Sequence, residues 1–454
     1  MSNCKIGLGK WSRLYINIFL AAIFKCLRDF LLNFNSIAPN SKLALFGFEP
    51  VLSNHTIIVN IYIYLSYIVF GLIFFYISNK KSIGEKQKTE KIENLEQRRI
   101  SFIHYNKNAV SKKEIYLTIL ISLIFVFHSD LIKILYLFEF SDFDIWTVDI
   151  VFISFFMNKY FVVNIYKHQK YAIYCICIIS TFCIFLSMFF PKNGDDNSFA
   201  KIYNLVGNIF FCFLIFFGFI LTSFIIDFGR VLTKVLMDLN FISPFIIIII
   251  TGTIGFILNL LILFIVSKCK CINETILDKA CLVKRENKKE KFFDNISIYF
   301  SELTEKVSSE SGYTSKMEFY VEIFLIVPLF LVFSFFEFYF EIKIYKNLSP
   351  IYILIRDNLY YGLSRIVSFC INPKNLEVFI LLVLAEIPAI LGYSVYLEII
   401  ELRFCGLDNK LKRKLTETAK LESQVNMINI EEMEDSDDEE DKEDNNKITP
   451  SSNL

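Results

Sequence analysis

Long apolar stretches dominate the chain and alternate with short polar segments. Ten stretches are each about 20 residues long, which is enough for a helix to cross a hydrocarbon core about 30 Å thick. The predicted spans are 12–33, 56–78, 115–138, 148–166, 171–190, 202–226, 245–266, 319–341, 350–371 and 376–400. The runs are too long and too continuously apolar for barrel strands, which alternate and need only about 10 residues each. The pattern therefore predicts an all-α polytopic membrane protein.

The spans divide into two groups of five, separated by the polar segment 191–201. Five is an odd number, so a second group with the same architecture must enter the membrane in the opposite orientation. We therefore expect ten transmembrane helices arranged as two inverted five-helix repeats, a design typical of transporters. The predicted regions are 1–190 with a cytosolic linker 79–114, 191–414 with an outer loop 267–318, and a disordered acidic cytosolic tail 415–454.

Composition agrees with a membrane protein and excludes a soluble core. Of 454 residues, 54% are hydrophobic and 50 are Phe, while the formal net charge is zero. The charge is segregated: basic residues flank the spans and acidic residues gather in the tail, which favours oriented insertion and not nucleic-acid binding.

Because basic loops near spans stay in the cytosol, both termini are predicted there. The cytosolic segments would be 79–114, 167–170, 343–346, 403–414 and the region around Arg230 and Lys234. The membrane is predicted to be an endomembrane, vacuolar, lysosomal or Golgi, or the plasma membrane.

The first span has two interpretations. Basic residues before an apolar stretch resemble a signal peptide, and Ala21-Ala22 would permit cleavage. Lys25, Arg28 and Asp29 stand where a cleavage region needs small neutral residues, which favours a retained anchor.

The predicted outer loop contains three cysteines, Cys269, Cys271 and Cys281. One disulfide between Cys281 and either of the other two would suit a lumenal loop, but spacing does not decide the pairing, and cysteine is common in this chain. Asn273 and Asn295 begin glycosylation motifs, which also arise by chance in a chain rich in Asn. Residues 292–307 are predicted to form an amphipathic helix along the membrane surface.

Ionisable residues inside spans are costly, so each is a candidate for function. The predicted substrate or ion pathway comprises His128, Asp130, Lys133, Asp149, Asn158, Lys159, Asp357, Asn358 and Arg365, with Lys25, Asp29, Glu337 and Glu386 as secondary members. Spans four and nine, the fourth members of their groups, both contain an acid followed by a base, two to three turns later in span four and about two turns later in span nine. Inverted repeats would bring such residues together near the midplane, around a polar cavity.

Two roles are open for these charges. Lys25, Lys133, Lys159 and Arg365 would capture an anionic group of a substrate, while Asp130, Asp149, Asp357 and Glu337 would bind a proton or a cationic group. His128 is of the residue type that changes charge near neutral pH. Alternatively the charges pair with one another to fix helix packing, or extend to the membrane surface near helix ends. The second interpretation suits Lys25, Arg28, Lys159 and Glu337, and the first suits Asp130, Asp357 and Arg365.

Motifs of several enzyme classes are absent from the sequence. No phosphate-binding loop, H-E-x-x-H motif, nucleophile elbow or paired C-x-x-C is present, and His128 is the only histidine in mid-span. We therefore expect neither an enzyme nor a metal or cofactor. Pro328 and Pro388 would interrupt spans eight and ten, and Gly252 and Gly255 would allow close helix packing in span seven.

Residues 230–256 resemble a segment of drug/metabolite transporters. The motif Leu236-Met237, then four residues, then Ile242-Ser243-Pro244 is similar to the turn between the sixth and seventh helices in the branch that includes nucleotide-sugar and chloroquine-resistance-type carriers. Residues 396–408 at the end of span ten are similar to that branch as well. The resemblance implies two inverted five-helix bundles around a central cavity, a lumenal disulfide-bearing loop between helices seven and eight, and solute transport.

The sequence thus predicts a secondary transporter of a small polar organic solute, with proton coupling as an option and the lipid bilayer as its environment. The alternative is a non-transporting scaffold or receptor-like protein whose charges neutralise one another. A channel is disfavoured because no filter-like run is present.

Overall fold

The computed structural model describes residues 8–37, 52, 55–90, 112–136, 146–161, 165–180, 182, 209–239, 242–268, 295–308, 319–371, 376–398 and 400. Within these residues the chain is almost entirely helical, with eleven α-helices. Their bounds are α1 Leu8–Ile37, α2 Thr56–Glu90, α3 Lys112–Tyr136, α4 Trp146–Phe161, α5 Lys167–Cys175, α8 Ile209–Leu239, α9 Pro244–Val266, α10 Ile296–Ser308, α12 Val327–Asn347, α13 Tyr352–Ile371 and α14 Leu376–Tyr396. Two π-helical segments, Ile176–Ser180 and Glu322–Ile326, continue α5 and precede α12.

Each predicted span overlaps a helix in its described part, and four of the described helices are long and apolar enough to cross a membrane. These four are Thr56–Lys80, Glu114–Ile132, Pro244–Val266 and Phe319–Asn347. Such helices mark a membrane-embedded protein, because only closed barrels and helices satisfy every backbone group in lipid. The predicted helix ends were less accurate: α2 runs to Glu90 and enters the predicted linker, and α8 extends to Leu239.

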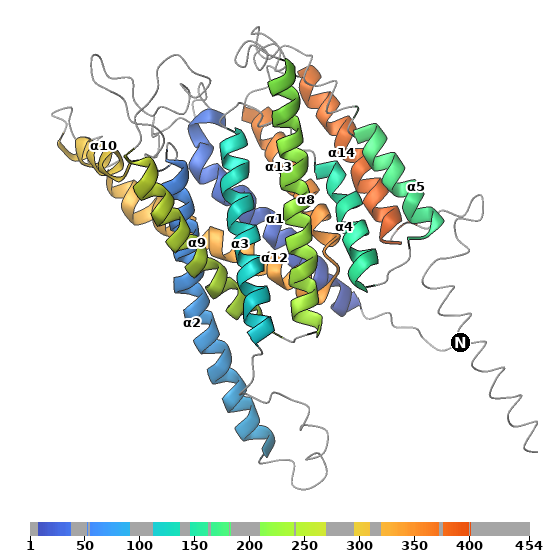
Figure 1. Cartoon of the computed structure of the whole chain (residues 1–454), viewed down its shortest axis with the longest axis horizontal. Helices are drawn as coiled ribbons and strands as arrows, with labels where there is room; N and C mark the ends of the chain where they lie inside the picture. The colour runs from blue at the N-terminus through green and yellow to red at the C-terminus, as the bar shows by residue number, and fades with distance from the viewer. Residues whose placement is uncertain are drawn as a thin grey trace, which may run out of the picture. The chain divides into compact units, whose positions relative to one another are not determined.

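The chain divides into two units, Met1–Asn164 with Cys175–Ile390, and Ile165–Tyr174 with Leu391–Leu454. In the first unit α2 lies along α9, and α1 lies along α12 (Figure 1). Helix α8 contacts both α3 and α4, and α13 contacts α1 and α4. Helix α12 also contacts α2, α8, α9 and α13, which gives it a central place in this unit.

Small residues allow α2 and α9 to approach closely. A Cβ atom added to Gly252 would lie 2.8 Å from Tyr67 Cβ and 3.0 Å from the Tyr64 carbonyl oxygen. At Gly255 the added atom would lie 2.4 Å from the Tyr64 ring. The close packing predicted for span seven is therefore present, as expected for membrane helices without a hydrophobic driving force between them.

Aromatic rings fill the contacts that α12 makes with α1 and α2. Phe24 stacks on Phe336 at a centroid distance of 5.3 Å, and Tyr67 stacks on Phe338 at 4.5 Å. Phe side chains therefore pack between helices, while others, such as Phe155 and Phe264, are exposed on the helix surfaces.

The predicted helix break at Pro328 takes the form of a π-helical segment. Val327 N–H bonds to the carbonyl of Glu322, five residues earlier. Proline has no N–H to donate, so the preceding turn widens. Pro388 lies within α14, and nothing in the structure marks a break there.

Helix α10 confirms that the predicted segment 292–307 is helical from Ile296 onward, and it shows which side is packed. Tyr299 and Leu303 are buried, whereas Ile296 and Phe300 are exposed. Asn295 caps the helix: its Oδ1 accepts hydrogen bonds from the N–H groups of Ser297 at 2.9 Å and of Ile298 at 3.4 Å.

The second unit is held by polar contacts around the start of α5. His168 is buried, and its Nε2 lies 3.3 Å from Glu398 Oε1. Gln169 accepts a hydrogen bond from Tyr166 N–H and donates one to the carbonyl of Tyr396. Glu398 has a φ of 59°, a left-handed conformation that ends α14.

Candidate functional site

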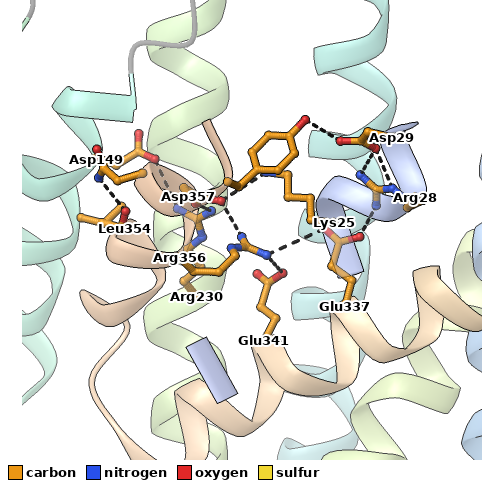
Figure 2. Close-up of polar contacts among 12 residues, drawn as sticks. Lys25, Arg28, Asp29, Asp149, Arg230, Glu337, Glu341, Leu354, Arg356 and Asp357 are labelled. Carbon is orange, nitrogen blue, oxygen red and sulfur yellow. Dashed lines mark hydrogen bonds and ion pairs between the residues drawn. The ribbon is translucent and has the colours of Figure 1, made fainter. Parts of the chain in front are cut away.

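Charged side chains from five helices of the first unit converge in its interior (Figure 2). We call this set the ion-pair network. Its ten members are Lys25, Arg28, Asp29, Asp149, Asp227, Arg230, Glu337, Glu341, Arg356 and Asp357. They come from α1, α4, α8, α12 and α13. Every one of these helices coincides with a predicted span, although several of the charges were not predicted to face the interior.

Arg230 lies at the centre of the network. Its Nη1 is 2.8 Å from Asp227 Oδ1 and 3.3 Å from Asp149 Oδ2, and its Nη2 is 3.3 Å from Asp357 Oδ2. The arginine is only 6% exposed. One guanidinium group therefore joins carboxylates of α4, α8 and α13, which suits its planar fork of donors.

Arg356 joins the C-terminal half of α12 to α13. It lies 2.8 Å from the neighbouring Asp357, 3.1 Å from Glu341 and 3.8 Å from Glu337. Tyr345 donates a hydrogen bond to the other oxygen of Glu341. The two acids are four residues apart, so they lie on one face of α12.

Helix α1 supplies the third part of the network. Arg28 binds Asp29 at 2.8 Å and also binds Glu337, and Tyr360 donates a hydrogen bond to Asp29 at 2.5 Å. Lys25 lies 3.2 Å from Asp357. Three charges of α1 thus engage α12 and α13.

The network contains more negative than positive groups. Among the described side chains it holds four cations and six carboxylates. Among the described residues, Asp149 Oδ1 and Asp227 Oδ2 have no hydrogen-bond partner, and both residues are more than nine-tenths buried. Buried acceptors without partners are expensive, so the arrangement has capacity for a donor or a cation.

Asp130 lies in a separate polar cluster between α2, α3 and α9. It accepts hydrogen bonds from the side-chain amides of Asn60 at 2.6 Å and Asn259 at 3.4 Å. Asn259 also donates to the carbonyl of Gly255 at 3.0 Å. Nearby, Ser122 and Thr251 are hydrogen-bonded across α3 and α9. The cluster ties the three helices together.

The structure brings some predicted pathway residues together and leaves others apart. Asp149, Asp357, Lys25, Asp29 and Glu337 belong to the network. Asn358 follows Asp357, is buried, and donates to the carbonyl of Leu354, while its Oδ1 has no hydrogen-bond partner.

His128 lies within electrostatic range of Arg230, Lys25 and Asp357 of the network, whereas Arg365 lies over an aromatic ring of α13. The Nδ1 atom of His128 on α3 is buried without a hydrogen-bond partner. Arg365 lies over the ring of Tyr361 at 5.8 Å. Asn158 and Lys159 are exposed on α4. Lys133 and Glu386 lie on α3 and α14, but their side chains are outside the described part of the structure.

The predicted loop residues are mostly outside the described ranges. These include Cys269, Cys271, Cys281 and Asn273. Asn295 is described, and its Nδ2 donates to the carbonyl of Ser267 at 3.2 Å. A glycan on that nitrogen would have to replace this hydrogen bond.

Sequence reasoning missed Arg230, Asp227 and Glu341 as interior groups. Arg230 was assigned to a cytosolic segment, whereas it lies inside α8 and is buried. The missing signal was spacing: Asp227 and Arg230 are three residues apart, which puts them on one helix face.

Comparisons with known proteins assign no function to the network. No model of a known protein family matches the chain, and no curated protein matches it.

Proposed function

We propose that the chain is a secondary carrier that moves a small polar organic solute across a membrane by alternating access, with protons as the candidate coupling ion. The ion-pair network carries this proposal. Charged residues buried among membrane helices are costly, and they typically mark substrate and ion paths. A surplus of carboxylates over cations favours exchange of protons or other cations with the solvent.

The helix contacts support a ten-span architecture with inverted repeats. In such an arrangement α1, α2, α3 and α4 correspond to α8, α9, α12 and α13. If each helix is replaced by its counterpart, the pair α1 and α12 becomes the pair α8 and α3. In the same way the pair α1 and α13 becomes the pair α8 and α4. The pair α2 and α12 likewise becomes the pair α9 and α3. The three pairs and their three counterparts are all in contact. The pairs α2 with α9 and α4 with α13 map onto themselves and are also in contact, as a two-fold relation requires.

The charges of the two fourth helices support the same proposal. Asp149 of α4 and Asp357 of α13 bind the same arginine, Arg230, each at 3.3 Å. Residues on counterpart helices that meet at one group are expected near the axis that relates two repeats. In carriers of this design the substrate site lies at that axis.

A second candidate function is a non-transporting scaffold or receptor-like protein. One observation favours it: each of the four cations in the network lies within 3.3 Å of a carboxylate. Mutual neutralisation of this kind fixes helix packing without any substrate.

Flux measurements separate the two candidates. The purified protein would be reconstituted into vesicles and tested with panels of neutral, anionic and cationic solutes at two pH values. A carrier gives saturable uptake of at least one solute, and Asp357→Asn lowers that uptake about tenfold or more, the factor that 1.4 kcal/mol of lost interaction produces.

The matched control is Lys234→Gln, which removes an ion pair with Asp238 at 2.9 Å and a hydrogen bond to the carbonyl of Lys346 at 3.4 Å, both outside the network, and should leave uptake unchanged. The absence of flux for every solute, with Asp357→Asn altering only thermal stability, would contradict a carrier and favour a scaffold.

A further inference from the structure

Lys25 places its ammonium group in a site formed by one face of α13. Its Nζ lies 3.2 Å from Asp357 Oδ1, 4.2 Å from the centroid of the Tyr360 ring and 5.4 Å from that of Tyr361. These three residues are at positions i, i+3 and i+4, so they project from the same side of the helix. A carboxylate beside aromatic faces is the arrangement with which proteins bind organic ammonium ions.

The site does not depend on Lys25 for its geometry. Asp357 is also held by Arg356 at 2.8 Å and by Arg230 at 3.3 Å. Tyr360 is held by its hydrogen bond to Asp29. The carboxylate and the nearer ring would therefore keep their positions if the lysine withdrew.

Lys25 is the most readily displaced cation of those that bind Asp357. Its side chain is 18% exposed, whereas that of Arg356 is 3% exposed and that of Arg230 is 8% exposed. A lysine ammonium is carried on a flexible four-carbon stem and gives no bidentate contact, so it exchanges more easily than a buried guanidinium group.

The charge of the network determines what can replace Lys25. Together with Arg365, which lies over the ring of Tyr361, the described network holds one more carboxylate than cations while Lys25 is in place, and two more once it leaves. An anionic solute would increase this excess in a buried site, and a cationic solute would reduce it.

We propose that Lys25 occupies the substrate site as an internal substitute, and that the transported solute is a small organic ammonium ion which displaces it from Asp357, Tyr360 and Tyr361. This inference rests on the proposed carrier function and specifies its substrate class. In the empty protein Lys25 neutralises the site, so the unloaded carrier changes orientation without an extra uncompensated charge.

Binding can be tested without transport by chemical complementation in detergent. The variant Lys25→Ala removes the ammonium and its stem, and n-butylammonium, which matches the lysine side chain in length, serves as the probe. The thermal unfolding midpoint of Lys25→Ala should rise as n-butylammonium is added. The rise should be half-complete at a concentration about tenfold lower than in the wild type, because Lys25 competes for the site in the wild type. The uncharged n-butanol should not reproduce the effect, and Lys234→Ala should respond as the wild type does.

Equal stabilisation by n-butanol, or an equal response of Lys25→Ala and Lys234→Ala, would overturn the inference. If Lys25→Ala does not yield folded protein, the wild type and Tyr361→Leu decide the question. The loss of that ring should weaken n-butylammonium binding several-fold, because it removes one aromatic face and leaves the bond between Tyr360 and Asp29 intact. Identical binding by the two proteins would contradict the site.

Vesicle assays distinguish this inference from the carrier proposal. Specific n-butylammonium binding without flux of any solute would contradict the carrier and leave the amine site supported. Saturable flux of another solute that n-butylammonium does not inhibit would contradict the amine site and leave the carrier supported. If n-butylammonium is itself transported, Lys25→Gln should slow its net uptake into empty vesicles more than its exchange across vesicles loaded with it. The reason is that only net uptake requires the unloaded protein to change orientation.

Discussion

Arg230 binds three carboxylates from three helices at distances between 2.8 and 3.3 Å. Removing one partner of a buried ion pair leaves the other charge uncompensated. This lowers the stability of the folded protein more than replacing all the paired residues by apolar residues does. The residue therefore combines two roles in the proposed carrier, since it holds the helices together and keeps Asp149 and Asp357 close to one another.

We expect Arg230→Met to lower the stability of the folded protein by about 3–5 kcal/mol, the usual cost of breaking a buried pair. Thermal unfolding in detergent micelles would measure the loss. Lys234→Met, four residues further along the same helix, is the control and should lower the stability by less than Arg230→Met does, because Lys234 pairs with one carboxylate, Asp238, which is 37% exposed. Equal stability of the two variants would show that Arg230 carries no structural load.

The charged residues could be found from the sequence, but their partners could not. Lys25, Asp149 and Asp357 stand out because they interrupt apolar stretches. Arg230 was missed because it follows the predicted span 202–226, and a hydropathy pattern cannot show that a helix continues beyond its apolar part. Glu341 was missed because it is the last residue of the predicted span 319–341, where a charged side chain is expected to reach the membrane surface. Pairing between α1 and α13 depends on tertiary packing, which no local pattern encodes.

At the scale of elements, the contact between α2 and α9 depends on glycine. Gly252 lies against the backbone of α2, where an added Cβ would come within 3.0 Å of both Ile68 N and the Tyr64 carbonyl oxygen. Backbone atoms cannot rotate away as the end of a side chain can, so the helices must move apart.

We therefore expect Gly252→Ala to destabilise the protein by about 1–3 kcal/mol, the usual cost of overpacking. Gly362→Ala on α13 is the matched control, since nothing lies within 4 Å of its added Cβ, and it should be neutral or stabilising by up to about 1 kcal/mol. Midpoints of thermal unfolding for the two variants would test this. A midpoint for Gly252→Ala that matches Gly362→Ala would contradict the close contact.

The N-terminal end of α10 should depend on Asn295. Asn295→Ala removes both accepted hydrogen bonds and the bond to the carbonyl of Ser267, so the first turn should lose about 1 kcal/mol. Hydrogen exchange at the amides of Ser297 and Ile298 should accelerate several-fold. Ser301 is exposed on the same helix, so Ser301→Ala should leave the exchange of the Ser297 and Ile298 amides unchanged. If Ser301→Ala accelerates the exchange of these two amides as much as Asn295→Ala does, Asn295 has no capping role.

The helices were well predicted because long apolar runs are strong signals, and the turn between α8 and α9 was marked by Ser243-Pro244. Proline favours the first position of a helix, and α9 begins at Pro244. The π-helical turn before Pro328 could not be predicted, since a proline in a membrane helix is accommodated in several ways.

At the scale of the whole molecule, the inverted-repeat proposal makes a prediction about sidedness. In a background without native cysteines, Lys268→Cys after α9 and Lys346→Cys near the end of α12 should lie on opposite sides of the membrane. A membrane-impermeant maleimide should label Lys268→Cys from the outer side of intact vesicles, and Lys346→Cys only after permeabilisation. Labelling of both from one side would contradict the ten-span topology.

The residue separations within the network have a consequence for biosynthesis. Lys25 and Asp357 are 332 positions apart, and Arg28 and Glu337 are 309 apart. During synthesis α1 therefore enters the membrane with Lys25, Arg28 and Asp29 long before their partners on α12 and α13 emerge from the ribosome. The nascent helix must be sheltered at the insertion machinery or stay near the lipid headgroups until its partners arrive. A chain cut short before α12 would leave these charges exposed to lipid, a defect that membrane quality control is suited to recognise.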